Sequence, residues 1–363
     1  MANSWPEARH RPHHAAKEDP MVTIGYSALG VSLPLFVAHR TGLFADRGLQ
    51  VKMRGYPTAH PLVEAIIDDG VPCGGFVAFP IALHRHVRAR PLHYACAVAE
   101  DLDNPISFLL VRKGSGIRSI EDLAGRRVGV LPTKAYREWL KVLLGRTGLG
   151  YHQVKLDKTC KCMETCATGN VPIERMVSVH DVLPHETAAA LRSARVEAIF
   201  TNDPGVTDAV RSGVADIFGD RPILPSLLGS PFLFGSFVLD SDFVADRPDE
   251  ARRIVAALDE GVRFCQQDPA EARRLAATYL PPSCADIRDG LGRPVFLTSR
   301  EVDTARLQVT IDLLADGGMI GGRVEIGPWV MGTNTALPCR STPRPARRSR
   351  ADNAEVVTGC GSS

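Results

Sequence analysis

The sequence predicts an α/β protein with two lobes, each built on a mostly parallel sheet. The chain has 363 residues, of which 44% are hydrophobic, so it can bury two cores. Short β-branched runs alternate with amphipathic helical stretches between about residues 22 and 330. This alternation is typical of parallel sheets flanked by helices.

Strands are expected where β-branched or aromatic residues form short apolar runs bounded by turn residues. In chain order these runs cover residues 22–26, 49–56, 73–80, 93–100, 106–113, 126–132, 176–182, 196–204 and 235–244. No internal repeat of fixed period accompanies them.

Helices are expected where apolar residues recur every three or four positions. These stretches are 33–48, with Gly42 and Gly48 as stops, then 61–70, 119–125, 134–148, 186–195, 248–268, 269–280 and 300–318. Ser119 with Asp122 forms a variant of the capping box. Asp249 and Glu250 lie in the first turn of their helix, where the helix dipole favours a negative charge.

The two ends of the chain lack apolar periodicity and are expected to be disordered. Residues 1–20 and 331–363 are rich in Pro, Arg, Ser and His. The run RSTPRPARRSR in the second tail is basic enough to contact an acidic partner, or it is a solvated tail.

Charge and hydropathy exclude several classes of partner. Lys and Arg total 43 against 41 Asp and Glu, interspersed along the chain, so neither nucleic acid nor an anionic membrane is expected. No apolar run is long enough to span a bilayer. The first twenty residues contain no unbroken apolar stretch of the secretion type, which predicts a cytoplasmic protein, or a periplasmic or cell-surface one if the true start lies upstream.

Four phrases in order carry a resemblance to a known family: LPLFVAHRTGLFADRGLQV, ISFLLVRKGSGIRSIEDLAGRRVGV, AAALRSARVEAIFTNDP and DPAEARRLAA. They resemble the type II periplasmic-binding-protein fold, in its sulfonate, nitrate, taurine and thiamine-precursor binding family. The resemblance implies lobe one from 21–110 plus 236–330, lobe two from 111–235, and a chain that crosses twice at a hinge. It also implies a small-molecule ligand between the lobes and an ABC transporter as a partner.

In such folds the ligand meets the carboxyl ends of strands and the N-termini of helices. The positions that the resemblance places there are Ser27, Ala28, Leu29, Val77, Ala78, Phe79, Thr133, Lys134, Tyr136, Asn202, Asp203 and Ser236. Thr133 serves equally well as a plain N-cap. Lys134 and Tyr136 suit an anionic or heteroaromatic ligand, although either side chain could face solvent.

A cysteine cluster interrupts lobe two in a segment, 155–176, that looks like an insertion. Cys160, Cys162 and Cys166 form C-x-C-x₃-C. With a nearby histidine these thiolates could hold zinc or iron, or they are surface thiols in a loop. No other cofactor is indicated by a recognised motif.

Two cytosolic enzyme families share the fold and supply the alternative function. Thiamine-pyrimidine synthases need a lysine and a histidine after the third strand to hold pyridoxal phosphate, whereas this chain offers His84 and His86 without lysine. Aromatic sulfinate desulfinases need a cysteine after the first strand, where Leu29 or a neighbour stands here. His60 lies where the histidine of the desulfinases would fall, and Gly74-Gly75 resembles the glycines that line their pocket. The catalytic candidates are therefore His60 and Lys134, which is also expected near the cleft.

The sequence therefore favours a protein that binds one small organic ligand between two lobes. The alternative is a cytosolic enzyme, like either of those two families, that uses the cysteine cluster as a metal or redox element. A lone histidine such as His60, without a placed partner, is better explained as a histidine at the start of a helix than as a catalytic one.

Overall fold

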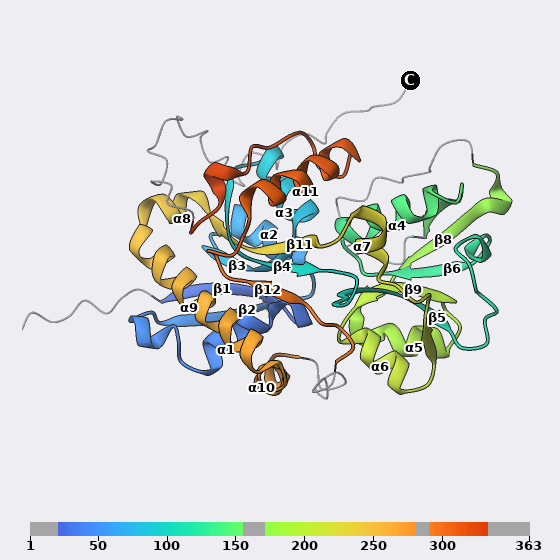
Figure 1. Cartoon of the computed structure of the whole chain (residues 1–363), viewed down its shortest axis with the longest axis horizontal. Helices are drawn as coiled ribbons and strands as arrows, with labels where there is room; N and C mark the ends of the chain where they lie inside the picture. Colours follow the sequence, from blue (N-terminus) through green and yellow to red (C-terminus); the bar gives the residue numbers. More distant parts are fainter. Residues whose placement is uncertain (1–20, 155–170, 281–289, 333–363) are drawn as a thin grey trace, which may run out of the picture.

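The computed structural model describes residues 21–154, 171–280 and 290–332. It has two lobes side by side, each with one six-stranded sheet covered by helices on both faces (Figure 1). This confirms the two-lobed α/β fold. Within the described residues, no helix is long and apolar enough to cross a membrane.

The sheet of lobe one has the strand order β12-β4-β11-β3-β1-β2. Its strands are β1 (Val22–Ser27), β2 (Val51–Tyr56), β3 (Cys73–Ala78), β4 (Leu92–Glu100), β11 (Phe232–Asp240) and β12 (Val295–Leu297). The strands β3, β4 and β11 are buried along their whole length, while the edge strand β2 alternates between half-buried and exposed residues. Burial on both faces explains why the central strands are nearly continuous apolar runs.

The sheet of lobe two has the strand order β10-β5-β9-β6-β8-β7. Its strands are β5 (Ser107–Arg112), β6 (Arg127–Val130), β7 (Gly150–Val154), β8 (Met176–Asp181), β9 (Ala198–Asn202) and β10 (Ala215–Ile217). Strands β6 to β9 pair in parallel, whereas β5 is antiparallel to both β9 and β10.

Both sheets are mixed rather than mostly parallel, and the crossing of the chain between lobes is the reason. The chain leaves lobe one after β4, enters lobe two at β5, and returns at β11. A strand that enters from the opposite side runs against its neighbours, so β11 is antiparallel to both β3 and β4. The two crossing strands are therefore paired, with Phe232 opposite Glu100.

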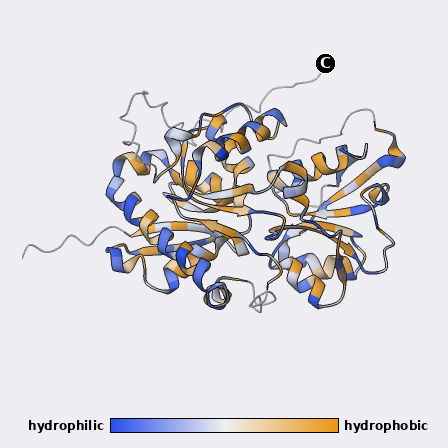
Figure 2. Cartoon of the chain, viewed as in Figure 1, coloured by the Kyte–Doolittle hydropathy of each residue, from blue (hydrophilic) through white to orange (hydrophobic). Residues whose placement is uncertain are grey.

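The helices sort onto the faces of the sheets (Figure 1). In lobe one, α1 (Leu33–Arg40), α9 (Pro248–Gln267) and α10 (Pro269–Ala276) cover one face, and α2 (Ala59–Asp68), α3 (Phe79–Arg88) and α11 (Thr304–Asp316) cover the other, with α8 (Ser241–Asp246) beside the end of β11. In lobe two, α4 (Lys134–Gly145) and α7 (Ile223–Leu228) lie opposite α5 (Thr187–Arg192) and α6 (Gly205–Arg211). Figure 2 shows their apolar faces turned toward the sheets.

Several elements differ in length from the sequence prediction. The helix expected over 33–48 ends at Arg40, because Gly42 adopts a left-handed φ of 82°; Gly48, at φ 66°, ends the 3₁₀ turn Ala45–Arg47 that follows. The helix expected over 119–125 is a single 3₁₀ turn (Glu121–Leu123), held by Asp122 Oδ2, which accepts the backbone N–H groups of Arg118 and Ser119. Strands β7 and β12 were not predicted, since the apolar run of each is very short.

Candidate ligand-binding site between the lobes

A pocket lies between the lobes, and both lobes contribute to its wall. This interlobe pocket contains ≈ 370 Å³ of empty space and opens to solvent. Its lining residues are Leu29, Val31, Pro57, Thr58, Ala59, Phe76, Ala78 and Ile81 of lobe one, Leu131, Thr133, Tyr136 and Asn202 of lobe two, and Phe234 of the returning strand β11. In the described part of the chain this wall carries no ionisable group other than the Tyr136 phenol.

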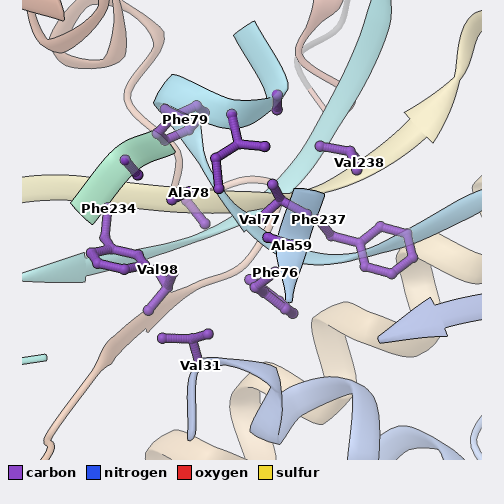
Figure 3. Close-up of a cluster of buried hydrophobic side chains, with 14 of the residues drawn as sticks. Val31, Ala59, Phe76, Val77, Ala78, Phe79, Val98, Phe234, Phe237 and Val238 are labelled. Carbon is purple, nitrogen blue, oxygen red and sulfur yellow. The ribbon is translucent and has the colours of Figure 1, made fainter. Parts of the chain in front are cut away.

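The wall is mainly apolar and is held by packed rings. Figure 3 shows Phe76 between Phe234 and Phe237, with Val31 below them. The Phe76 ring lies edge-on to Phe237, 6.2 Å between centroids, and Phe234 packs against Trp139 at 5.2 Å. Since these rings are fixed by neighbours behind the wall, the pocket is largely preformed.

Three helices begin at the interlobe pocket. Thr58 precedes α2, Ala78 precedes α3 and Thr133 precedes α4. Only Thr133 caps its helix, because its Oγ1 accepts the N–H of Tyr136 at 3.3 Å, whereas neither Thr58 nor Ala78 makes a side-chain cap bond. The N-terminal ends of α2 and α3 therefore lie at the pocket without a side-chain cap. Pro61 and Pro80 have no N–H group, and the remaining first-turn N–H groups favour an acceptor-rich or anionic ligand group.

Two polar side chains of lobe two complete the wall. Tyr136 is only 1% exposed, and burial raises the pKa of its phenol well above 10, so it stays neutral and acts through hydrogen bonds. Asn202 is 2% exposed and pairs with Ser107 across the β5–β9 ladder. The amide oxygen of Asn202 has no hydrogen-bond partner, although it is buried at the pocket. A buried acceptor left unpaired is costly, which marks it as a group that a ligand can satisfy.

The structure brings only some of the predicted ligand-contacting residues to this pocket. Those on its wall are Leu29, Ala78, Thr133, Tyr136 and Asn202. Those elsewhere are Ser27, Ala28, Val77, Phe79, Lys134, Asp203 and Ser236. Val77 and Phe79 are buried in lobe one, where Phe79 packs against Tyr94 at 5.9 Å.

Ser236 and Asp203 have structural partners that keep them from the interlobe pocket. Ser236 Oγ donates to the carbonyl oxygen of Cys96 at 2.7 Å, within the sheet of lobe one. Asp203 accepts the Thr207 hydroxyl at 2.7 Å and the Gly292 N–H at 2.6 Å. Asp203 lines a neighbouring pocket with Gly30 and Arg273, and this second pocket shares Val31 and Asn202 with the first.

The two catalytic candidates lie beside the pocket rather than on its wall. Burial, together with the smaller effect of the positive charges of Arg137 and Lys134, lowers the pKa of His60 to about 4. His60 is therefore neutral at pH 7, and its Nδ1 has no partner. Lys134 Nζ lies 3.6 Å from Glu138 in an ion pair along α4.

The predicted metal site lies outside the described residues, since Cys160, Cys162 and Cys166 all do. Among the residues that the structure describes, no three His, Cys, Asp or Glu side chains are arranged to hold a metal ion. Cys73, Cys96 and Cys265 are free and buried, and burial raises the pKa of each thiol.

Gly74 and Gly75 serve packing rather than the pocket wall. A Cβ on Gly75 would lie 2.2 Å from the Phe237 ring, and one on Gly74 would lie 2.9 Å from the Gly25 carbonyl oxygen. The two glycines therefore let β1 and β11 approach β3 closely.

Sequence reasoning missed much of the apolar wall. The missed residues are Val31, Pro57, Thr58, Ala59, Phe76, Ile81, Leu131 and Phe234. It also missed Glu100, a fully buried carboxylate at the end of β4. The sequence does contain a signal for Glu100, since it is the one acidic residue at the end of the apolar run HYACAVAE.

Comparison with known proteins agrees with this architecture. The model of the NMT1-like family matches residues 15–280. A Brucella abortus protein described provisionally as a binding protein is 22% identical over 312 residues, which are 85% of each chain.

Solved structures share the fold at low identity. The alkanesulfonate-binding protein SsuA of Xanthomonas axonopodis pv. citri, bound to MOPS, has a TM-score of 0.61 and 18% identity over 86% of this chain and 98% of its own. The aliphatic sulphonate binding protein SsuA of Escherichia coli has a TM-score of 0.63 and 17% identity, covering 92% and 99% of the two chains. The desulfurization enzyme DSZB reaches a TM-score of 0.55 at 17% identity, covering 85% and 96%. These likenesses establish the fold of type II periplasmic binding proteins.

Proposed function

The chain belongs to the NMT1-like family, and on that premise we propose that it is a substrate-binding protein that holds one small organic molecule between its lobes. The observation that carries this proposal is the interlobe pocket, whose wall comes from both lobes. A ligand that touches both walls binds the closed arrangement better than an open one, so it shifts the lobes toward closure.

The chemistry of the wall supports a ligand with two parts. An apolar body fits against Leu29, Phe76 and Phe234. An acceptor-rich or anionic group fits at the uncapped N-termini of α2 and α3.

The partner is an importer of the ABC type in this proposal. The structural neighbours include sulfonate-binding proteins and a ligand-binding component of an ABC-type import system from Staphylococcus aureus. Sulfonates with an apolar body are therefore the first ligands to test. A receptor of such an importer works outside the inner membrane, so the proposal places the protein in the periplasm; the cytoplasmic expectation depends on residues 1–20, which lie outside the described part.

An enzymatic role gains no support from the described residues. Leu29 stands on the pocket wall where a desulfinase would need its nucleophile. Within the described chain the wall offers no thiol, imidazole, amine or carboxylate for covalent or acid–base chemistry.

Calorimetric titration with a panel of sulfonates tests the proposal. The panel comprises hexanesulfonate, benzenesulfonate, 4-hydroxybenzenesulfonate and 4-methoxybenzenesulfonate. Ala78→Trp adds an indole at the wall of the pocket, whereas Val309→Trp adds the same indole at a position on α11 that is 60% exposed.

We expect one-to-one binding by the wild type and by Val309→Trp, and none by Ala78→Trp. Equal binding by all three proteins would place the site elsewhere. No binding of any panel member by the wild type would count against a sulfonate-type ligand and against this proposal.

A further inference from the structure

The chain touches lobe two once more just before it enters β12. The strap, residues 290–294, leads directly into this edge strand of the lobe-one sheet, and Figure 1 shows it in orange beside α6. The chain itself passes between the two sheets before β5 and at β11. The strap is therefore a further connection between the lobes, and noncovalent contacts hold it to lobe two.

Asp203 and Thr207 of lobe two hold the strap by its backbone. Asp203 Oδ2 accepts the Gly292 N–H at 2.6 Å, and Thr207 Oγ1 accepts the Leu291 N–H at 2.9 Å. The two side chains are also joined, since the Thr207 hydroxyl and N–H donate to Asp203 Oδ1 at 2.7 and 2.9 Å. Asp203 is 8% exposed and Thr207 is 1% exposed. The two oxygens of one buried carboxylate thus serve different lobes, and a charged acceptor makes the stronger kind of hydrogen bond.

The strap makes further contacts along its length. The carbonyl oxygen of Gly292 accepts a hydrogen bond from Arg273 of α10 at 3.1 Å, so lobe one binds this residue at its carbonyl group while lobe two binds its N–H group. The Leu291 side chain packs against an apolar cluster of lobe two. Arg293 N–H donates to the carbonyl oxygen of Pro105 at 2.8 Å, in the segment that crosses from β4 to β5. Both backbone and side-chain contacts therefore tie the strap to lobe two.

The close approach of the strap to lobe two requires a glycine at position 292. A Cβ on Gly292 would lie 2.9 Å from Asp203 Oδ2 and 3.5 Å from Asp203 Cβ. The carboxylate is fixed by Thr207, so it has little room to retreat. Any larger residue at this position would push the strap away from Asp203.

The strap joins the lobes at the edge of the interlobe pocket. Asp203 directly follows Asn202, which lines the pocket from lobe two. The carbonyl oxygen of Asp203 accepts the Gly30 N–H at 3.5 Å, between Leu29 and Val31, which line the pocket from lobe one. Release of the strap would therefore let the two walls of the pocket move apart.

We propose that Asp203 is a positioning residue which, with Thr207, binds the strap and limits how far the lobes open in the ligand-free protein. This deepens, and rests on, the proposed ligand-binding function, because the strap regulates the same interlobe pocket. The apparent dissociation constant is the intrinsic one divided by the fraction of protein that is closed. Loosening the strap therefore weakens the binding of every ligand that touches both walls, although neither Asp203 nor Thr207 is on the described wall.

Small-angle X-ray scattering of the ligand-free protein measures the opening of the lobes. Asp203→Ala removes the hold on the strap, and Asp259→Ala is its matched control. Asp259 is 7% exposed and accepts the Ser299 N–H at 2.6 Å and the Ser299 hydroxyl at 2.7 Å, with both residues in lobe one. We expect the radius of gyration to increase in Asp203→Ala and to equal that of the wild type in Asp259→Ala.

Two further variants loosen the strap without removing a buried charge. Thr207→Val keeps the shape of the side chain but cannot accept the Leu291 N–H, whereas Thr207→Ser keeps the hydroxyl. Gly292→Ala adds the obstructing Cβ, and Gly327→Ala is its control, since a Cβ on Gly327 has its nearest neighbour at 3.8 Å. We expect Thr207→Val and Gly292→Ala to increase the radius of gyration, and the other two variants to match the wild type.

Hydrogen exchange separates a loosened strap from a general loss of stability. In Asp203→Ala the amides of Leu291 and Gly292 should exchange about tenfold faster than in the wild type, the value of one good hydrogen bond. The amides of α9, in the core of lobe one, should keep their wild-type rates. A protein that was only less stable would exchange faster in both places.

The binding arm uses the tightest-binding sulfonate of the panel. It should bind Asp203→Ala about tenfold more weakly than the wild type, through faster dissociation, and Asp259→Ala as tightly as the wild type. Equal affinity in an Asp203→Ala protein whose lobes have opened would overturn the link between the strap and the pocket.

A radius of gyration that stays at the wild-type value in both Asp203→Ala and Gly292→Ala would overturn the proposal. An equal increase in Asp259→Ala would overturn it as well, because the opening would then not depend on the strap. Failure of the wild type to bind any panel member would count against the proposed function, while scattering and hydrogen exchange still decide whether Asp203 holds the lobes together.

Discussion

Replacing Glu100 with glutamine should change how the stability of the protein depends on pH. Glu100 is fully buried, and its pKa is raised from 4.5 to about 7. A raised carboxyl pKa means that the folded chain prefers the protonated form. The stabilisation is complete below pH 4.5 and is lost as pH rises through about 7.

The size of the effect follows from the two pKa values. At about 1.4 kcal/mol per pH unit, a pKa difference of about 2.5 corresponds to roughly 3 kcal/mol in total. Between pH 5 and pH 8 the change covers most of this, about 2.5 kcal/mol. Glu100→Gln cannot ionise, so its free energy of unfolding lacks this decrease.

Denaturant unfolding of both proteins at pH 5, 6, 7 and 8 measures the difference directly. Subtracting the two curves removes every other titrating group that the proteins share. We expect the free energy of unfolding of Glu100→Gln, relative to that of the wild type, to rise steadily from pH 5 to pH 8. Parallel curves over the whole range would refute the reasoning, because they would show that Glu100 has the same pKa in the folded and unfolded chain.

Three further predictions concern other buried groups. Burial lowers the pKa of His93 to about 4, so the stabilisation by its neutral form is complete above pH 6.5 and is lost as pH falls toward 4. In His93→Gln the free energy of unfolding should decrease less in acid, by up to about 3 kcal/mol, as measured by denaturant unfolding. An acid dependence equal to that of the wild type would contradict this. Gly75→Ala should lower the free energy of unfolding by about 1–3 kcal/mol, because its Cβ meets the Phe237 ring, and a thermal melt equal to wild type would refute this. Thr133→Ala should cost about 1 kcal/mol through the lost cap of α4, measured in urea, with Thr133→Ser as the control that keeps the cap.

The sequence could predict which strand ends meet between the lobes. Leu29, Ala78, Thr133 and Asn202 follow apolar runs, and the ends of strands that alternate with helices gather at one edge of a sheet. The order of runs and helices is a local property, so it can be seen without the fold.

The side chains of the returning strand could not be predicted in the same way. The prediction placed Ser236 at the ligand, but β11 begins at Phe232 and has two register shifts against β4 and one against β3. Such shifts change which residues face the pocket, and they brought Phe234 to the wall instead. The hydrogen bonds of Glu100 with Ile106 and Ser107 could not be predicted either, because the crossing of the chain between the lobes sets them.

A crystal structure of the protein with the tightest-binding sulfonate of the panel tests the central claim most directly. The account predicts that the apolar body lies against Phe76 and Phe234, that the sulfonate meets the first turns of α2 and α3, and that any hydroxyl of the ligand donates to the Asn202 amide oxygen. A ligand held instead in the neighbouring pocket beside Asp203 and Arg273, or outside the lobes, would contradict it.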